Sequence, residues 1–369
     1  MSRIKVLTAL LLAGLFALLI PLSLVLAQDA SGTASVQDSD NTEYSNRLSD
    51  QLSIELMDLD ALPPNMAYEG WLVSDDGSRT ESTGILVTDA NGAVSQTFAL
   101  MADGEPTGEN LLGAFDKFVV TVEPVPDSDP GPSDEIEAIH QKPTAGMAHI
   151  RNLTYSAEGN PPYMAGNFHE GMPKGDAVGL RQQIGVAIEH SDLAFEASEL
   201  AMVQEHACHV VNVIDGTGGA NYDSACGDPG DGIGILNYSD STAMQAGLAA
   251  SAAPDEGVIV ANGQLAIDRA QSAAKAATQA RAEALAARAS TDVAVGKIHI
   301  GNARDLLNKA LGEASNAYTA SQAMGTYTIA PPPPTGDYNV PTLALLTLLI
   351  GAALLVSGTL VFRHDRAAS

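Results

Sequence analysis

The residues from Val340 to Phe362 form an apolar run without a charged side chain, and Arg363-His-Asp-Arg366 follows at once. A run of this length crosses about 30 Å of hydrocarbon as a helix. Basic residues directly after such a span stay on the cytoplasmic side of the membrane. The sequence therefore predicts a single transmembrane helix at 340–362, a cytoplasmic tail at 363–369 and an extracytoplasmic location for almost everything before them.

The other end of the chain has the layout of a secretory signal. Met1-Ser-Arg-Ile-Lys5 is basic, the stretch from Val6 to Ala27 is apolar, and Val25 and Ala27 are the small residues that a cleavage site requires. We expect residues 1–27 to be a signal peptide. An uncleaved anchor is the alternative, because the apolar stretch is long and contains Pro21.

The net charge of the chain and the sequence just before the predicted membrane span indicate which partners the protein can have and where in the cell it is located. The formal net charge of −27 excludes nucleic acid as a partner, since phosphate binding needs clustered Lys and Arg. We expect the membrane as one partner, envelope proteins as others, and a single-pass location in the plasma membrane. Pro332-Pro-Pro-Thr-Gly336 also resembles a cell-wall sorting signal, but Pro332 stands where that signal has leucine, so a retained anchor is preferred.

The first predicted folded unit is rich in β structure. Residues 28–50 are polar and acidic, which predicts a disordered leader. Between residues 51 and 135, short β-branched and aromatic runs alternate with Asp, Asn and Gly turns, a spacing typical of a small antiparallel β-sandwich. The runs are Tyr68–Val73, Gly84–Thr88, Ser95–Leu100 and Lys117–Val122.

Three stretches of this unit resemble a known family. Tyr68-Glu-Gly-Trp71-Leu-Val, Gly84-Ile-Leu and Phe118-Val-Val-Thr-Val-Glu123-Pro124, with a Ser/Asp/Pro tail behind them, are similar to the C-terminal, extracytoplasmic domain of anti-sigma-K factors of the RskA type, over about residues 50–135. The resemblance implies that fold and a sensing or interaction role. Since a signal peptide stands where the family has its cytoplasmic sigma-binding segment, sigma-factor inhibition is not expected.

The second predicted unit is helical. After a connector at 136–174, apolar residues recur at helical spacing without proline from Gly175 to Ile214, and further helical segments follow. They predict an antiparallel bundle of three long helices and one shorter helix over residues 175–325. A proline-rich stalk at 326–339 leads to the membrane span. The expected fold is thus multidomain α and β, with a β-sandwich, a helical bundle and one C-terminal transmembrane helix.

Histidines in the predicted bundle are candidate metal ligands. At 100° per residue along the helix, His206 and His209 lie on the same core-facing side as Phe195, and Glu199 lies near the edge of that side. The same calculation places His299 on the inward-facing side of the last predicted helix. Imidazoles with a carboxylate can bind zinc, copper or iron. The alternatives are a structural histidine network and a pocket for an organic ligand.

The two remaining sequence features concern His190 and the cysteines. The helix phase that turns His206 inward places His190 on the outer, solvated face. Cys208 and Cys226 are predicted to form a disulfide, because the segment is placed outside the cell. In the predicted helix, Cys208 points away from the core and toward a glycine-rich loop. A disulfide with Cys226 would attach this loop to the helix. Haem attachment is excluded, because it requires Cys-x-x-Cys-His.

No arrangement of residues in the sequence indicates catalysis. We therefore expect a protein that is not an enzyme, needs no cofactor, and serves interaction or sensing at the bacterial envelope. The alternative function is a bundle that binds a metal or a small ligand through inward-facing histidines.

Overall fold

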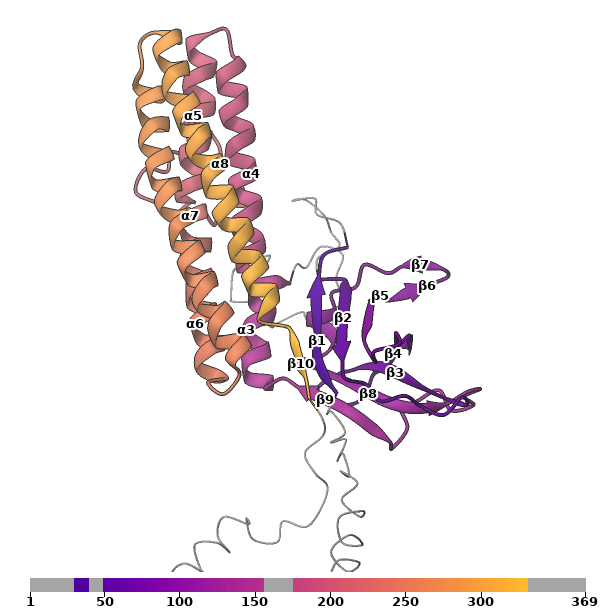
Figure 1. Ribbon diagram of the computed structural model, residues 1–369. Helices are drawn as coiled ribbons and strands as arrows, with labels where there is room; N and C mark the ends of the chain where they lie inside the picture. The colour runs from indigo at the N-terminus through magenta and orange to yellow at the C-terminus, as the bar shows by residue number, and fades with distance from the viewer. Residues whose placement is uncertain (1–29, 40–48, 156–174, 331–369) are drawn as a thin grey trace, which may run out of the picture. The chain divides into compact units, whose positions relative to one another are not determined.

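The computed structural model describes residues 30–39, 49–155 and 175–330 (Figure 1). They form antiparallel sheets and a helical bundle, which confirms the predicted mixture of β and α structure. The predicted signal peptide at 1–27, the membrane span at 340–362 and the tail at 363–369 lie outside the described residues. Among the helices that the structure describes, none has the length and apolar character needed to cross a membrane.

The first sheet has the strand order β10-β1-β2-β5 and is antiparallel throughout. In β2, Leu52, Ile54 and Leu56 are buried while the residues between them are more exposed, because successive side chains of a strand point to opposite faces. The four strands are β1 (Ser31–Gln37), β2 (Gln51–Met57), β5 (Val94–Ala99) and β10 (Tyr327–Ile329). A short hairpin, β6 (Met101–Ala102) and β7 (Glu105–Pro106), follows β5.

The second sheet has the strand order β4-β3-β8-β9 and is also antiparallel. Its strands are β3 (Met66–Val73), β4 (Thr80–Leu86), β8 (Lys117–Pro124) and β9 (Ile136–Gln141), and the single-turn helix α2 (Leu111–Ala114) precedes β8. One face carries a small cluster in which Trp71 donates a hydrogen bond of 2.7 Å from Nε1 to Thr121. The other face joins the main core of the β part.

The helical part follows β9. It consists of α3 (Thr144–Thr154), α4 (Asp176–Glu196), α5 (Leu200–Asp215), α6 (Ile235–Ala252), α7 (Gly257–Ala289) and α8 (Val293–Ala323). The long helices α7 and α8 run side by side (Figure 1). Their interface is lined with alanine, which lets the two backbones approach closely. On α7 the buried alanines are Ala266, Ala270, Ala273, Ala276, Ala277, Ala280, Ala284 and Ala287.

The β part and the helices share one hydrophobic core. Leu52 and Phe118 from the two sheets lie in the same cluster of buried residues as Met147 of α3, Ile259 of α7 and Met324 at the end of α8. The part of the bundle farther from the sheets has a second cluster of buried hydrophobic residues, which contains the buried alanines of α7 from Ala270 onward. The sheets are therefore packed against the base of the bundle instead of being joined to it by a linker alone.

Two segments near the ends of the chain that were expected to be irregular contribute strands. Part of the predicted disordered leader, residues 28–50, is β1, and it pairs with β2 over its whole length. The predicted stalk at 326–339 begins with β10, which covers the other edge of β1. Between these neighbours Gly32 has φ 144°, and a Cβ there would lie 2.1 Å from the carbonyl oxygen of Glu55. The prediction of disorder relied on the polarity of the segment, but β1 pairs with a strand on each side and buries the small side chains of Ala34 and Val36.

The connector and the bundle also differ from expectation. Residues 136–174 were expected to be irregular, but β9 adds to the second sheet and α3 packs on α6. The single helix expected from Gly175 to Ile214 is broken between Glu196 and Leu200, so that α4 and α5 form an antiparallel pair. This break changes the direction in which every later side chain of the segment points.

Candidate metal centre

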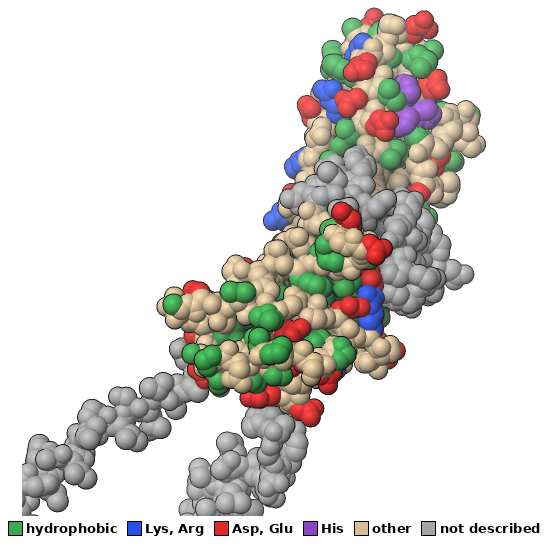
Figure 2. All heavy atoms as spheres, turned by 90° about the vertical axis from the view of Figure 1, so that its right-hand side faces the viewer, with side chains coloured by type: hydrophobic (Ala, Val, Ile, Leu, Met, Phe, Trp, Pro, Cys, Tyr) green, Lys and Arg blue, Asp and Glu red, His purple; other side chains and the backbone are tan. Residues whose placement is uncertain are grey.

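Three histidines meet where α4 and α5 lie against each other. His190 comes from α4, and His206 and His209 come from successive turns of α5. His190 and His206 are equally distant in sequence from Ser198, the middle of the break, and the chain reversal there brings them face to face. The two helices are neighbours in the bundle. Figure 2 shows histidine side chains gathered in one patch on the surface of the bundle, with carboxylates nearby.

The ring nitrogens of these histidines converge. Nδ1 of His190 lies 3.2 Å from Nδ1 of His206 and 3.2 Å from Nδ1 of His209. One ligand atom from each of the three rings can be chosen so that all lie within 4.8 Å of one another. All three side chains are half-buried. The arrangement therefore has the residue types and the spacing of a site for one transition-metal ion.

The environment keeps two of the rings neutral near pH 7. Burial, and then the neighbouring imidazoles of His209 and His206, lower the pKa of His190 to about 4. Burial and then His209 lower the pKa of His206, against the opposing effect of Glu205. A neutral imidazole has a free lone pair, which is the form that a metal ion requires.

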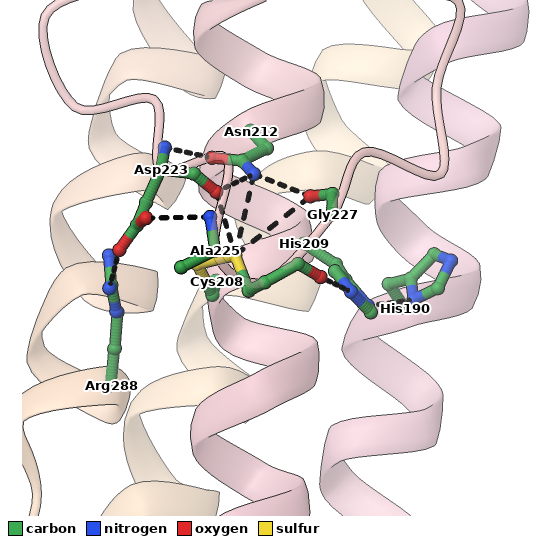
Figure 3. Close-up of a disulfide and its surroundings, with 9 residues drawn as sticks. His190, Cys208, His209, Asn212, Asp223, Ala225, Gly227 and Arg288 are labelled. Atoms are coloured by element: carbon green, nitrogen blue, oxygen red, sulfur yellow. Dashed lines mark hydrogen bonds and ion pairs between the residues drawn. A yellow bond between two sulfur atoms is a disulfide. The ribbon is translucent and has the colours of Figure 1, made fainter.

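A hydrogen bond to the backbone orients the third ring. Nε2 of His209 donates to the carbonyl oxygen of Cys226, in the loop that follows α5 (Figure 3). With the proton on Nε2, Nδ1 carries the lone pair, and this is the nitrogen that faces His190. The carbonyl of Cys226 thus acts as the outer partner that metal-binding histidines commonly have.

Cys226 is held in place by the disulfide. Cys208 and Cys226 are bonded, with their Cα atoms 6.3 Å apart, which confirms the predicted pairing. Cys208 points toward the loop, as expected, and lies outside the hydrophobic cluster that contains its neighbours Ala207 and Val210. It is only 2% exposed, because the loop that it anchors covers it. The disulfide fixes the residue whose carbonyl accepts the His209 hydrogen bond.

Side chains of the bundle hold the same loop. Asn212 donates from Nδ2 to the carbonyl oxygens of Asp223, at 2.8 Å, and Gly227, at 2.6 Å, and its Oδ1 accepts from the amide of Asp223 at 2.8 Å (Figure 3). Arg288 of α7 forms an ion pair with the Asp223 carboxylate. The loop is therefore connected both to α5, which carries two of the histidines, and to α7.

Only part of the predicted ligand set comes together. His206 and His209 lie in the cluster, whereas His299 is engaged elsewhere: its Nδ1 is 2.8 Å from a carboxylate oxygen of Glu283 on α7. Glu199 is the N-cap residue of α5, in the turn between the two helices. Among the residues that the structure describes, the group able to hold a metal ion is His190, His206 and His209.

The break between α4 and α5 explains the missed ligand. Phase arithmetic that runs one helix through residues 197–199 takes Phe195 as core-facing and His190 as solvated, but Phe195 is 40% exposed and His190 faces α5. Ser198 is a residue that favours helix ends. If the helix were ended there, the equal spacing of His190 and His206 on either side would have predicted their contact.

Comparison with protein families matches the N-terminal part of the chain. Residues 6–136 match the family model "Anti-sigma-K factor rskA, C-terminal", which confirms the resemblance inferred from the β strands. The match also includes the N-terminal apolar stretch and covers about a third of the chain, leaving the helices from α3 onward outside it. Comparisons with curated proteins and with solved structures gave no significant match.

Proposed function

We propose that the chain is a non-enzymatic, membrane-anchored protein whose folded part lies outside the plasma membrane and serves interaction or sensing at the bacterial envelope. The observation that carries this proposal is the match of residues 6–136 to the C-terminal domain of anti-sigma-K factors. Because the match is to that C-terminal domain, binding of a sigma factor is not proposed for this chain.

Two further features support an extracytoplasmic location. The Cys208–Cys226 disulfide is of a kind that persists in oxidising compartments and is rare in the cytosol. The sequence has an apolar stretch near each end, and the basic residues after Phe362 favour an orientation with the bulk of the chain outside. Retention of the C-terminal span is preferred to cell-wall sorting.

The disulfide provides a test of the location. The full chain is expressed in a bacterial host, membranes are washed at high pH, and free thiols are labelled with a maleimide polymer before and after reduction. We expect membrane association, digestion by protease added to spheroplasts, and labelling of both cysteines only after reduction. A matched variant that lacks residues 1–27 should keep free thiols and resist the added protease. A full chain that is protected from protease and has free thiols would contradict the proposal.

The interaction role can be tested at an exposed surface of the β part. A pocket lined by residues of β1, β2 and β5 and of the loop between β4 and β5 is bordered by Met57 and Val87, which are 57% and 73% exposed. A photo-crosslinking residue at position 87 should give a defined product with an envelope protein in intact cells. The same residue at position 298 of α8, where Ile298 is 64% exposed, serves as the control. Identical products from both positions would argue against a specific interaction through the β part.

A further inference from the structure

The inference concerns the histidine cluster, in which two nitrogen–nitrogen distances match those between the ligands of a metal ion. In a tetrahedral zinc site with bonds of about 2.0–2.1 Å to imidazole nitrogens, two ligand nitrogens lie about 3.3 Å apart. The distances from Nδ1 of His190 to Nδ1 of His206 and of His209 are both 3.2 Å. Two of the three nitrogen–nitrogen distances are therefore close to those between ligands of a tetrahedral zinc ion, and all three ligand atoms lie within 4.8 Å of one another.

The protons available to the cluster do not satisfy all three nitrogens. The proton of His209 is on Nε2, where the carbonyl of Cys226 accepts it, so Nδ1 of His209 has only a lone pair to offer. If Nδ1 of His190 carries a proton, that proton has to serve both His209 and His206. If Nδ1 of His206 donates to His190 instead, two lone pairs face each other between His190 and His209. A cation at the centre of the three nitrogens would accept all three lone pairs at once. The cluster therefore fits a metal ion better than it fits a hydrogen-bonded network.

Access and charge are also consistent with metal binding. The three side chains are half-buried and lie at the surface of the bundle, which leaves an open side for an ion to enter (Figure 2). Glu205 adds negative charge next to His206. The net charge of the chain, −27, raises the local concentration of cations further.

We propose that His190, His206 and His209 bind one Zn²⁺ ion through their Nδ1 atoms and leave the fourth tetrahedral position to water or another exchangeable ligand. Zinc is preferred to copper, because the two distances of 3.2 Å are close to the spacing of ligands in a tetrahedral site, whereas Cu²⁺ favours tetragonal geometry. The site differs from the set expected from the sequence, since His190 takes the place of His299 and Glu199.

Zinc binding is tested on the full chain in detergent, with the disulfide oxidised and with a purification tag that contains no histidine. Isothermal titration with zinc chloride should show one equivalent bound. His190→Gln should weaken binding by more than about 100-fold, because loss of even an outer partner of a ligating histidine costs about 10- to 100-fold. His299→Gln is the matched control and should bind zinc like the unsubstituted chain, since His299 pairs with Glu283 outside the cluster.

A second measurement does not depend on variants. Long-range proton–nitrogen spectra of the chain labelled with ¹⁵N-histidine should show, on addition of zinc, Nδ1 coordination and protonated Nε2 for three histidines. Absence of zinc uptake by the oxidised chain would overturn the proposal. So would equal affinities of the His190→Gln and His299→Gln variants, with far-UV circular dichroism confirming that both are folded, or coordination through Nε2.

Discussion

Tyr318 of α8 donates a hydrogen bond of 2.8 Å to Oδ1 of Asp38, which directly follows β1. The tyrosine is 1% exposed, and the guanidinium of Arg181 on α4 lies 4.2 Å from its ring centroid. The same carboxylate oxygen accepts a second hydrogen bond from Gln322. The first strand and the last helix are therefore joined by a polar contact inside the molecule, in addition to the shared core.

Replacing Tyr318 by Phe should lower the free energy of unfolding by about 1–3 kcal/mol, because a partly buried carboxylate loses a donor. Urea unfolding followed by circular dichroism should show a lower midpoint with an unchanged slope. Tyr222→Phe, in the loop before Cys226 where the residue is partly exposed, is the control and should change the free energy by less than about 0.5 kcal/mol. Equal midpoints for the two variants would show that the Asp38 contact contributes nothing.

Lys142 gives the protein a specific pH dependence. Its ammonium is buried, donates to the carbonyl of Thr326, and lies 5.1 Å from the ring centroid of Tyr327. Burial lowers its pKa from 10.5 to about 8, against a smaller opposing effect of Glu256. Between these two pKa values the unfolded chain binds a proton that the folded chain does not. The contribution of Lys142 to stability is therefore complete above the unfolded pKa and is lost as the pH falls toward 8.

The free energy of unfolding of the Lys142→Met variant should accordingly rise less than that of the unsubstituted chain between about pH 8 and 9.5, a window below the ionisation of unfolded tyrosines near about pH 10. Denaturant unfolding at several pH values in this window measures the difference. Lys275→Met, at an exposed position of α7, should keep the original slope. If the Lys142→Met variant has the same pH dependence of the free energy of unfolding as the unsubstituted chain, the pKa of Lys142 is not lowered by its burial.

The disulfide should contribute substantially to stability. Replacing both Cys208 and Cys226 by Ala opens a loop with a sequence separation of 18 and should lower the free energy of unfolding by about 3 kcal/mol. The comparison is made by denaturant unfolding in the presence of a chelator, so that bound metal does not contribute. Adding reductant should bring the unsubstituted chain to the same midpoint and leave the variant unchanged. A midpoint that neither change affects would contradict the prediction.

The alanine-lined surface of α7 should not accept larger residues. Ala280 is fully buried, so Ala280→Leu adds volume where helices are already in contact and should cost about 1–3 kcal/mol. Ala282 is exposed on the same helix, and Ala282→Leu is the matched control, with little effect on the melting temperature. Thermal unfolding of the two variants distinguishes burial from helix propensity, which is the same in both. Similar melting temperatures would mean that the interface is loose at Ala280.

Much of the local structure could be predicted from the sequence. The β-branched and aromatic runs around Trp71 and Val120 are strands, the proline-free alanine-rich stretches are helices, and the two cysteines form a disulfide. These features depend on local propensity or on the small number of possible partners. The family resemblance also depended on local runs, and the match to residues 6–136 agrees with it.

Long-range pairing could not be predicted in the same way. β1 is polar and short of large apolar residues, and its strand character comes from its pairing with β2 and β10, which no property of its own residues indicates. The candidate metal centre shows the same limitation. His190 meets His206 because the chain reverses after Glu196, and a single helix continued through that break would not bring the two residues together.

The pairing of β1 with β10 affects the order in which the chain can fold during synthesis. Chains are made from the N-terminus, and early segments commonly fold as soon as their partners have emerged. Here β1 can pair with β2 early, but its other edge stays open until Tyr327–Ile329 have been made and have crossed the membrane. Tyr318 and Met324, which help to complete the core of the β part, also emerge late. The β part should therefore reach its final stability only when the bundle does, and it should remain exposed to chaperones and proteases until then.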